Sequence, residues 1–151
     1  MVDTYPIPPA NIEPNVDTAG LQNVLTHTVH AKDRLQIVRE NLDRTTLNVA
    51  DSLIAKHIAH SEQLSRMITE KGGKPDASGG VGSSLSASLS KIGAMFDDDT
   101  ADSMETIRDG EEEVMDAFGE ALGKITDGPE HDELVKMRDE ISRICKGDTV
   151  A

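Results

Sequence analysis

The sequence predicts an all-α protein, a four-helix bundle whose middle connection is a long crossover carrying a short extra helix. Apolar residues recur every three or four positions in four stretches, which places them on one face of a helix in each stretch. No stretch shows, with comparable quality, the alternation of apolar and polar residues that marks a strand. The connection at about residues 72–100 is long enough to run the length of a bundle.

The first two helices are predicted with apolar faces over residues 21–42 and 46–71. The second ends at Gly72-Gly73-Lys74-Pro75, because glycine accepts a left-handed conformation and proline lacks an amide donor. The junction at 43–46 holds helix-capping residues but neither glycine nor proline. A single long helix through this junction, as in an extended coiled-coil adapter, therefore stays open as an alternative.

The second half of the chain predicts a short helix at about residues 85–96 and then two long helices. Asp97-Asp98-Asp99-Thr100 offers caps for the third main helix. Asp127-Gly128-Pro129 predicts a tight turn, with the proline at the first position of the fourth helix. The predicted organisation is a proline-rich extended tail at residues 1–17, a bundle at 18–146 and a C-terminal tail at 147–151.

Composition excludes several classes of partner. The formal net charge is −13, with 28 acidic against 15 basic residues, which disfavours binding to a phosphate backbone. No apolar run approaches the roughly 20 residues of a membrane helix, and no basic-then-apolar leader opens the sequence. The single cysteine, Cys145, excludes an intrachain disulfide. We expect a soluble cytoplasmic protein that binds neither nucleic acid nor membrane.

Three ionisable residues fall on apolar helix faces. His57 lies at the centre of the second helix's face, and His60 lies within roughly 60° of it. Glu111 lies near the centre of the third helix's face. A carboxylate at such a position is costly unless it is hydrogen-bonded, paired or bound to a metal.

The levels of these groups along the bundle also agree. Glu111 lies level with His57 if the second and third helices run parallel, and level with His60 if they run antiparallel. Glu133 and Glu140 flank the apolar face of the fourth helix and supply further oxygens. Two interpretations follow, a buried hydrogen-bonded His-Glu pair and a metal site.

Signatures of catalysis are few. The run Gly79-Gly80-Val81-Gly82 follows no strand and lacks the Lys-Ser/Thr of a phosphate-binding loop. No nucleophile elbow and no His-Glu-x-x-His motif occurs. Cys145 has no dedicated base and is expected to be a packing residue. We therefore expect no catalytic residues, although an enzyme stays an open alternative.

Several segments resemble the domain-of-unknown-function 2383 (DUF2383) family, an uncharacterised branch of the ferritin-like superfamily. The resemblance covers about residues 21–144 and depends on the order of the segments more than on any one of them. They are Leu21-Gln22-Asn23-Val24-Leu25, then His60-Ser61-Glu62-Gln63-Leu64 running to Gly72-Gly73-Lys74-Pro75, and finally Arg108-Asp109-Gly110-Glu111-Glu112 leading to Ala117-Phe118-Gly119-Glu120-Ala121-Leu122.

This resemblance implies a ferritin-like four-helix bundle with no established reaction, often found in bacterial stress or storage contexts. Di-iron members of the superfamily carry Glu-x-x-His motifs on two helices, and this sequence has none. A reduced site for iron, zinc or manganese is therefore the metal hypothesis, with His57, His60, Glu111 and Glu133 as ligands. The leading hypothesis is a non-catalytic homo-oligomeric bundle with an interaction or oligomerisation role in bacterial stress or maintenance, with or without a cofactor.

Overall fold

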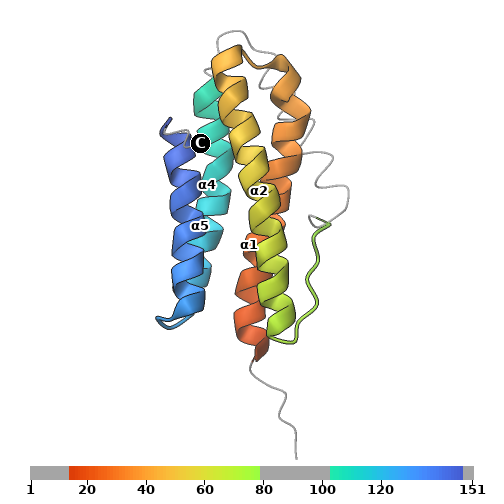
Figure 1. The fold of residues 1–151 in the computed structure, drawn as a ribbon, viewed down its shortest axis with the longest axis vertical. Coiled ribbons are helices and arrows are strands. Elements are labelled where there is room, and N and C mark those ends of the chain that lie inside the picture. Colours follow the sequence, from red (N-terminus) through yellow and green to blue (C-terminus); the bar gives the residue numbers. More distant parts are fainter. Residues whose placement is uncertain (1–13, 79–102, 148–151) are drawn as a thin grey trace, which may run out of the picture.

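Four long α-helices lie side by side along the molecule (Figure 1). The computed structural model describes residues 14–78 and 103–147, and no strand occurs in these two ranges. The predicted short helix at 85–96 lies outside them. In chain order the elements are α1 at Pro14–Val38, a 3-10 turn η1 at Arg39–Asn41, α2 at Arg44–Glu70, α4 at Ser103–Leu122 and α5 at Pro129–Cys145.

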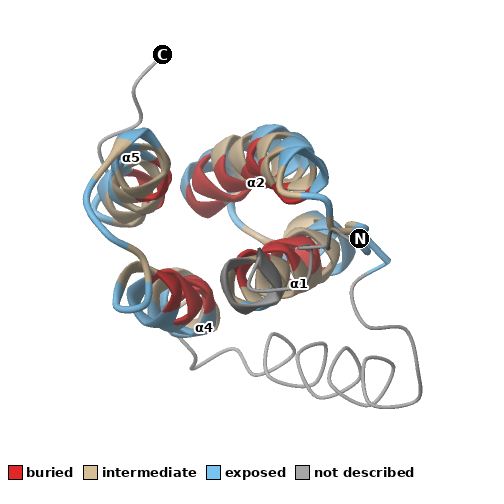
Figure 2. Cartoon of the chain, turned by 90° about the horizontal axis from the view of Figure 1, so that it is seen from below, coloured by how far each residue is buried: buried red, intermediate tan, exposed pale blue. Residues whose placement is uncertain are grey.

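The helices form a square in cross-section (Figure 2). α1 and α5 each contact both α2 and α4, so α2 and α4 occupy one diagonal. α2 runs antiparallel to α1, and α5 runs antiparallel to α4, whereas α2 and α4 run in the same direction (Figure 1). α2 therefore ends at the opposite end of the bundle from the start of α4. The prediction of an all-α protein with four main helices is confirmed over the described residues.

The boundaries of α1 differ from the prediction at both ends. α1 begins at Pro14, ahead of the predicted residue 18, because proline suits the first turn of a helix, where an amide donor is not needed. At its other end a 3-10 turn follows α1, and the Asp43 carboxylate then caps α2 by accepting from the Thr46 amide at 2.7 Å. The first two helices are thus separate, which settles the alternative of one continuous helix.

The core consists of two apolar clusters stacked along the bundle axis. The Phe118 cluster fills the half nearer the α4–α5 turn, and the Leu53 cluster fills the half nearer η1. All four helices contribute to each of them. The Phe118 cluster comprises Leu21, Val24, Leu25, Val29, Ala31, Leu64, Ile68, Val114, Ala117, Phe118, Ala121, Leu134 and Met137, and the Leu53 cluster comprises Leu35, Val49, Ala50, Leu53, Ile107, Ile141 and Ile144.

The end of α2 is shaped by two glycines, as the sequence predicts. Gly72 has a φ of +88°, and its amide donates to the Thr69 carbonyl at 2.9 Å, while the Gly73 amide donates to the Ile68 carbonyl at 2.9 Å. The chain then turns back onto α1, where the Gln22 side chain and the Asp76 backbone exchange two hydrogen bonds of 2.9 Å. Among the described residues no helix is both long and apolar enough to cross a membrane.

Replacing Gly73 with alanine is predicted to destabilise this turn. A Cβ there would lie 2.9 Å from Ile68 Cγ2, 3.1 Å from Thr18 Cγ2 and 3.3 Å from the Ile68 carbonyl oxygen. We expect Gly73→Ala to lower the free energy of unfolding in urea by about 1–3 kcal/mol. The matched control is Gly119→Ala on the exposed side of α4, where no atom lies within 4 Å of the added Cβ. That change should raise stability by about 0.5–1 kcal/mol, and equal effects of the two would contradict the packing argument.

Candidate functional site

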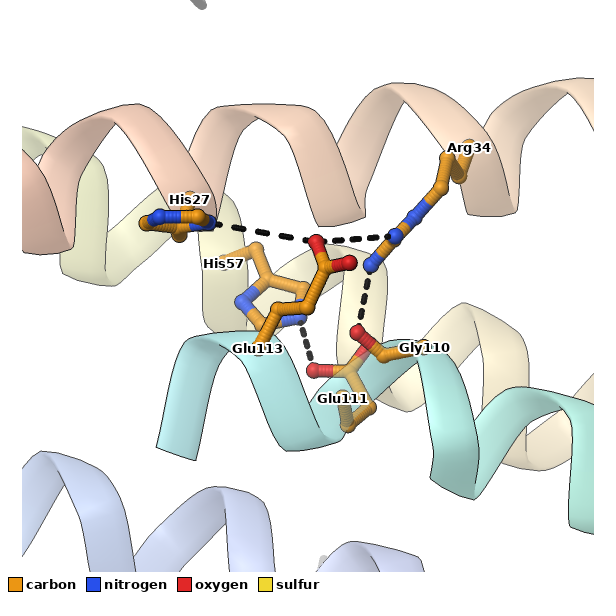
Figure 3. A network of polar contacts seen from close by, with 6 residues as sticks. All are labelled: His27, Arg34, His57, Gly110, Glu111 and Glu113. Carbon is orange, nitrogen blue, oxygen red and sulfur yellow. Dashed lines mark hydrogen bonds and ion pairs between the residues drawn. The ribbon is translucent and has the colours of Figure 1, made fainter. Parts of the chain in front are cut away.

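A buried His-Glu pair joins the two diagonal helices at the middle of the bundle. His57 Nε2 on α2 lies 2.8 Å from Glu111 Oε2 on α4 (Figure 3). His57 is 0% exposed and Glu111 is 2% exposed. Both groups are shielded from water. Each therefore provides the hydrogen-bond partner without which the other would be costly to bury.

The helical periodicity explains why these two residues meet. His57 follows Leu53 by one turn of α2, and Glu111 follows Ile107 by one turn of α4, so each occupies a position on the apolar face. Since α2 and α4 run parallel, the two groups come level with each other. The sequence predicted this pairing for parallel helices, and the contact is found. The pair lies at the boundary between the Leu53 cluster and the Phe118 cluster.

His60 contacts a glutamate on α5, whereas His57 contacts one on α4. His60 Nε2 lies 3.2 Å from Glu140 Oε1 on α5, and the other oxygen of that carboxylate accepts a hydrogen bond from Lys56 Nζ at 2.5 Å. The His60 and Phe118 rings are also nearly perpendicular to each other, with centroids 6.5 Å apart and planes at 85°. His60 thus links α2 to α5, whereas His57 links α2 to α4.

Burial and charge act in opposite directions on this second group of residues. Burial lowers the pKa of His60 below its ordinary value, although the Glu140 carboxylate acts to raise it. For Glu140, partial burial alone would raise the carboxyl pKa, but hydrogen bonds from Lys56 and His60 outweigh it and leave the pKa lowered. The favoured state is therefore a neutral His60 beside an ionised Glu140.

Glu133 lies apart from the other three predicted site residues. Its carboxylate accepts a hydrogen bond from the Gln63 side-chain amide on α2. The structure therefore brings His57 together with Glu111, and gives His60 the partner Glu140 rather than Glu133. Both glutamates flank the apolar face of α5 in sequence, and only the direction and level of α5 decide which of them reaches His60.

Among the buried side-chain atoms that have no hydrogen-bond partner in the described part of the chain, three belong to residues that are themselves buried. They are the Nδ1 atoms of His57 and His60 and the hydroxyl oxygen of Thr28. Thr28 is 0% exposed and lies on α1, so polar groups from all four helices reach the interior or its edge. No group of three or more His, Cys, Asp or Glu side chains within residues 14–78 and 103–147 is placed to hold a metal ion.

A second polar network links α1 to α4 (Figure 3). Arg34 Nη2 donates to the Gly110 carbonyl at 2.5 Å, and Arg34 Nη1 lies 3.5 Å from Glu113 Oε2. The same oxygen lies 3.9 Å from His27 Nδ1. A Cβ on residue 110 would lie only 3.3 Å from the guanidinium, so Gly110 allows the arginine to approach. The sequence alone does not predict this network, because the network depends on two helices meeting edge to edge.

Cys145 packs against the Leu53 cluster at the end of α5. Burial, with the charge of Glu111 adding to it, raises the pKa of its thiol to about 12. The thiol is therefore protonated near neutral pH and is a poor nucleophile, in agreement with its predicted packing role.

Comparison with known proteins gives one finding. The model of a family described as a domain of unknown function (DUF2383) matches residues 18–124. No curated protein and no solved structure matches the sequence. The matched range contains α2 and α4 with the His57–Glu111 pair, and it ends before α5.

A double-mutant cycle tests the energetic coupling of the pair. Glu111→Leu or His57→Leu alone leaves the other polar group buried without its partner, and should lower the free energy of unfolding by about 3–5 kcal/mol. The double variant removes both groups and should lose far less than the sum of the two, or even gain stability. Denaturant unfolding of all four proteins measures the coupling, and additive losses would show that the two side chains act independently.

Proposed function

The chain belongs to the DUF2383 family, and from this premise we propose that it is a cytoplasmic, ferritin-like bundle that acts without catalysis. Its proposed role is interaction or oligomerisation, in bacterial stress or maintenance. The observation that carries this proposal is the sealed His57–Glu111 pair, because a catalytic residue has to touch its substrate, and both of these side chains are shielded from water.

The order and direction of the helices support the ferritin-like assignment. α1 and α2 form one antiparallel pair and α4 and α5 form another (Figure 1). The parallel course of α2 and α4 requires one long connection between the pairs. A bundle with one such crossover is typical of ferritin-like folds, whereas an up-and-down bundle has short turns throughout.

The hydrogen-bonded polar pairs in the interior support a structural role for these residues. The contact of His57 with Glu111 links α2 to α4, and the contact of His60 with Glu140 links α2 to α5. In each contact an imidazole nitrogen lies against a carboxylate oxygen. A buried polar contact of this kind disfavours alternative registers, since a shifted helix would leave a buried polar group without a partner. The interior polar groups thus help to fix the arrangement of the helices. Contact with other molecules is proposed to involve the outer faces of the bundle.

Two large apolar side chains on the outer surface favour self-association. Ile37 on α1 is 48% exposed and Ile58 on α2 is 41% exposed. Ile37 lies on the side of α1 opposite its buried face. Covering these side chains in an assembly would remove apolar surface from water.

The oligomerisation proposal predicts that the purified protein has a mass that is a multiple of the 16.3 kDa chain. An Ile37→Glu, Ile58→Glu variant should shift the mass toward the monomer, because it places charges where an apolar contact is proposed. Light scattering coupled to size exclusion measures both masses. The matched control is Gln36→Glu, Ala59→Glu, which adds the same charge at neighbouring exposed positions on the same helices. A parent protein that is monomeric at every concentration would contradict the proposal.

The second candidate function is metal binding inside the bundle. The observation that favours it is the pair of unpartnered Nδ1 atoms on His57 and His60, which lie on the same face of α2 one turn apart. Imidazole nitrogens with carboxylate oxygens are ligands suited to iron, zinc or manganese. His57, His60 and Glu111 would hold the ion, with Glu133 as the further predicted ligand. The contact of Glu133 with Gln63 would then have to break, and so would that of Glu111 with His57 Nε2, because Nδ1 points in a different direction.

Elemental analysis separates the two functions. The protein is produced with iron, manganese and zinc in the medium and purified without chelators or metal-affinity tags. The metal-binding candidate predicts near-stoichiometric metal that is lost in a His57→Leu, Glu111→Gln variant. The proposed non-catalytic bundle predicts no metal in either protein. Circular dichroism of the variant checks that the helices remain, so that loss of metal is not loss of fold.

A further inference from the structure

The outward side of α2 carries a row of exposed residues with an apolar side chain near its middle (Figure 2). At 100° per residue the five members of this row fall within about 80° of one another, and each lies 100° or more from the buried His57. The apolar member, Ile58, is 41% exposed. We call the row the α2 stripe, and it consists of Asp51, Ala55, Ile58, Glu62 and Arg66.

The two ends of the α2 stripe carry opposite charges. Asp51 lies seven residues before Ile58, and Arg66 lies eight residues after it. A rise of 1.5 Å per residue therefore places the two charges about 11 and about 12 Å from the apolar middle. Arg39 holds the Asp51 carboxylate in place, with Nε 2.9 Å from Oδ1 and Nη2 3.1 Å from Oδ2. Arg66 has no ion-pair partner among residues 14–78 and 103–147.

This order of charges is complementary to itself when a second copy lies antiparallel. A two-fold axis that crosses α2 between residues 58 and 59 brings Ile58 against Ile58 of the second copy, and Asp51 level with Arg66 of the second copy. Ala55 then lies level with Glu62, so no two like charges face each other. A parallel arrangement in register would instead place Asp51 against Asp51 and Arg66 against Arg66, which is repulsive.

The outer sides of the other helices suit a second copy less well. The exposed residues of α4 are mostly acidic, and residues 103–147 as a whole hold 13 acidic and six basic residues, whereas residues 14–78 hold eight of each. Two α4 faces would therefore repel each other. α5 exposes charges of both signs but no large apolar side chain. α1 exposes Ile37 but no charged residue between Thr18 and Val38.

We propose that two copies of this chain associate through antiparallel contact of their α2 stripes. The inference rests on the proposed oligomerisation and names the face that carries it. Ile58 of each copy supplies the apolar contact at the two-fold axis. The pairs of Arg66 with Asp51 on either side of the axis set the direction and the register of the two helices. Ala59, about 100° around α2 from Ile58, lies at the margin of this contact.

Reversing one charge at a time tests the antiparallel pairing. Asp51→Lys faces Arg66 of the second copy with a like charge, and Arg66→Asp does the same to Asp51. Each variant alone should raise the dissociation constant of the dimer by about tenfold or more. A mixture of the two variants has opposite charges at both contacts, so heterodimers should form with about the affinity of the parent. Light scattering over a range of concentrations measures the dissociation constants, and native mass spectrometry with one variant isotope-labelled identifies the heterodimer.

Three further variants assign the effect to the α2 stripe. Ile58→Glu alone should raise the dissociation constant by about a hundredfold, because it places a charge in the apolar contact. Arg39→Gln breaks the pair with Asp51 inside one copy but keeps both charges of the stripe, and should leave the dimer intact. Asp139→Lys makes the same change of charge as Asp51→Lys on the exposed side of α5, and should also leave it intact. Circular dichroism checks that every variant keeps its helices.

The outcomes separate this inference from the proposed oligomerisation. A parent protein that is monomeric at every concentration would contradict both. An oligomeric parent whose mass persists in Asp51→Lys, Arg66→Asp and Ile58→Glu would contradict the α2 contact and leave the oligomerisation standing. Single variants that dissociate but do not associate when mixed would overturn the antiparallel pairing. Dissociation by Asp139→Lys, with Asp51→Lys unaffected, would assign the contact to α5 instead.

Discussion

The contact between His57 and Glu111 constrains most of the arrangement of the bundle. Both groups are almost completely buried, and a buried carboxylate without a partner is far more costly than a misplaced apolar side chain. The contact joins helices on the diagonal of the square, so it sets their relative level as well as their orientation. Once α2 and α4 are level and parallel, the connection between them has to start and finish at opposite ends of the bundle.

The same contact divides the core into two halves. Apolar side chains fill the Phe118 cluster on one side and the Leu53 cluster on the other, and the polar groups lie at the boundary between them. Such a boundary stabilises less than continuous apolar packing would, because the nitrogens of His57 and His60 facing away from the carboxylates remain without partners. In return it discriminates against slipped registers, in which a polar group would face an apolar cluster.

α5 relates to the other three helices differently. Its apolar face packs into both clusters, but its edge toward α2 depends on glutamates whose partners are charged or polar. The family match ends at residue 124, so Glu140, the partner of His60, comes from a helix outside the matched range. The described structure therefore combines a buried contact between His57 and Glu111 with an α2–α5 edge whose ion pairs are partly exposed.

The sequence by itself determined the helices, their apolar faces and the breaks at Gly72-Gly73 and Asp127-Gly128-Pro129, because these depend on local periodicity and on backbone conformations that few residues accept. It also placed His57 and Glu111 on inward faces. The separation of α1 from α2, the parallel course of α2 and α4, and the choice of Glu140 over Glu133 were decided only by the tertiary structure. Periodicity gives the direction of a side chain around its own helix, whereas a contact between helices also requires their order, direction and relative level, and these are properties of the packed bundle.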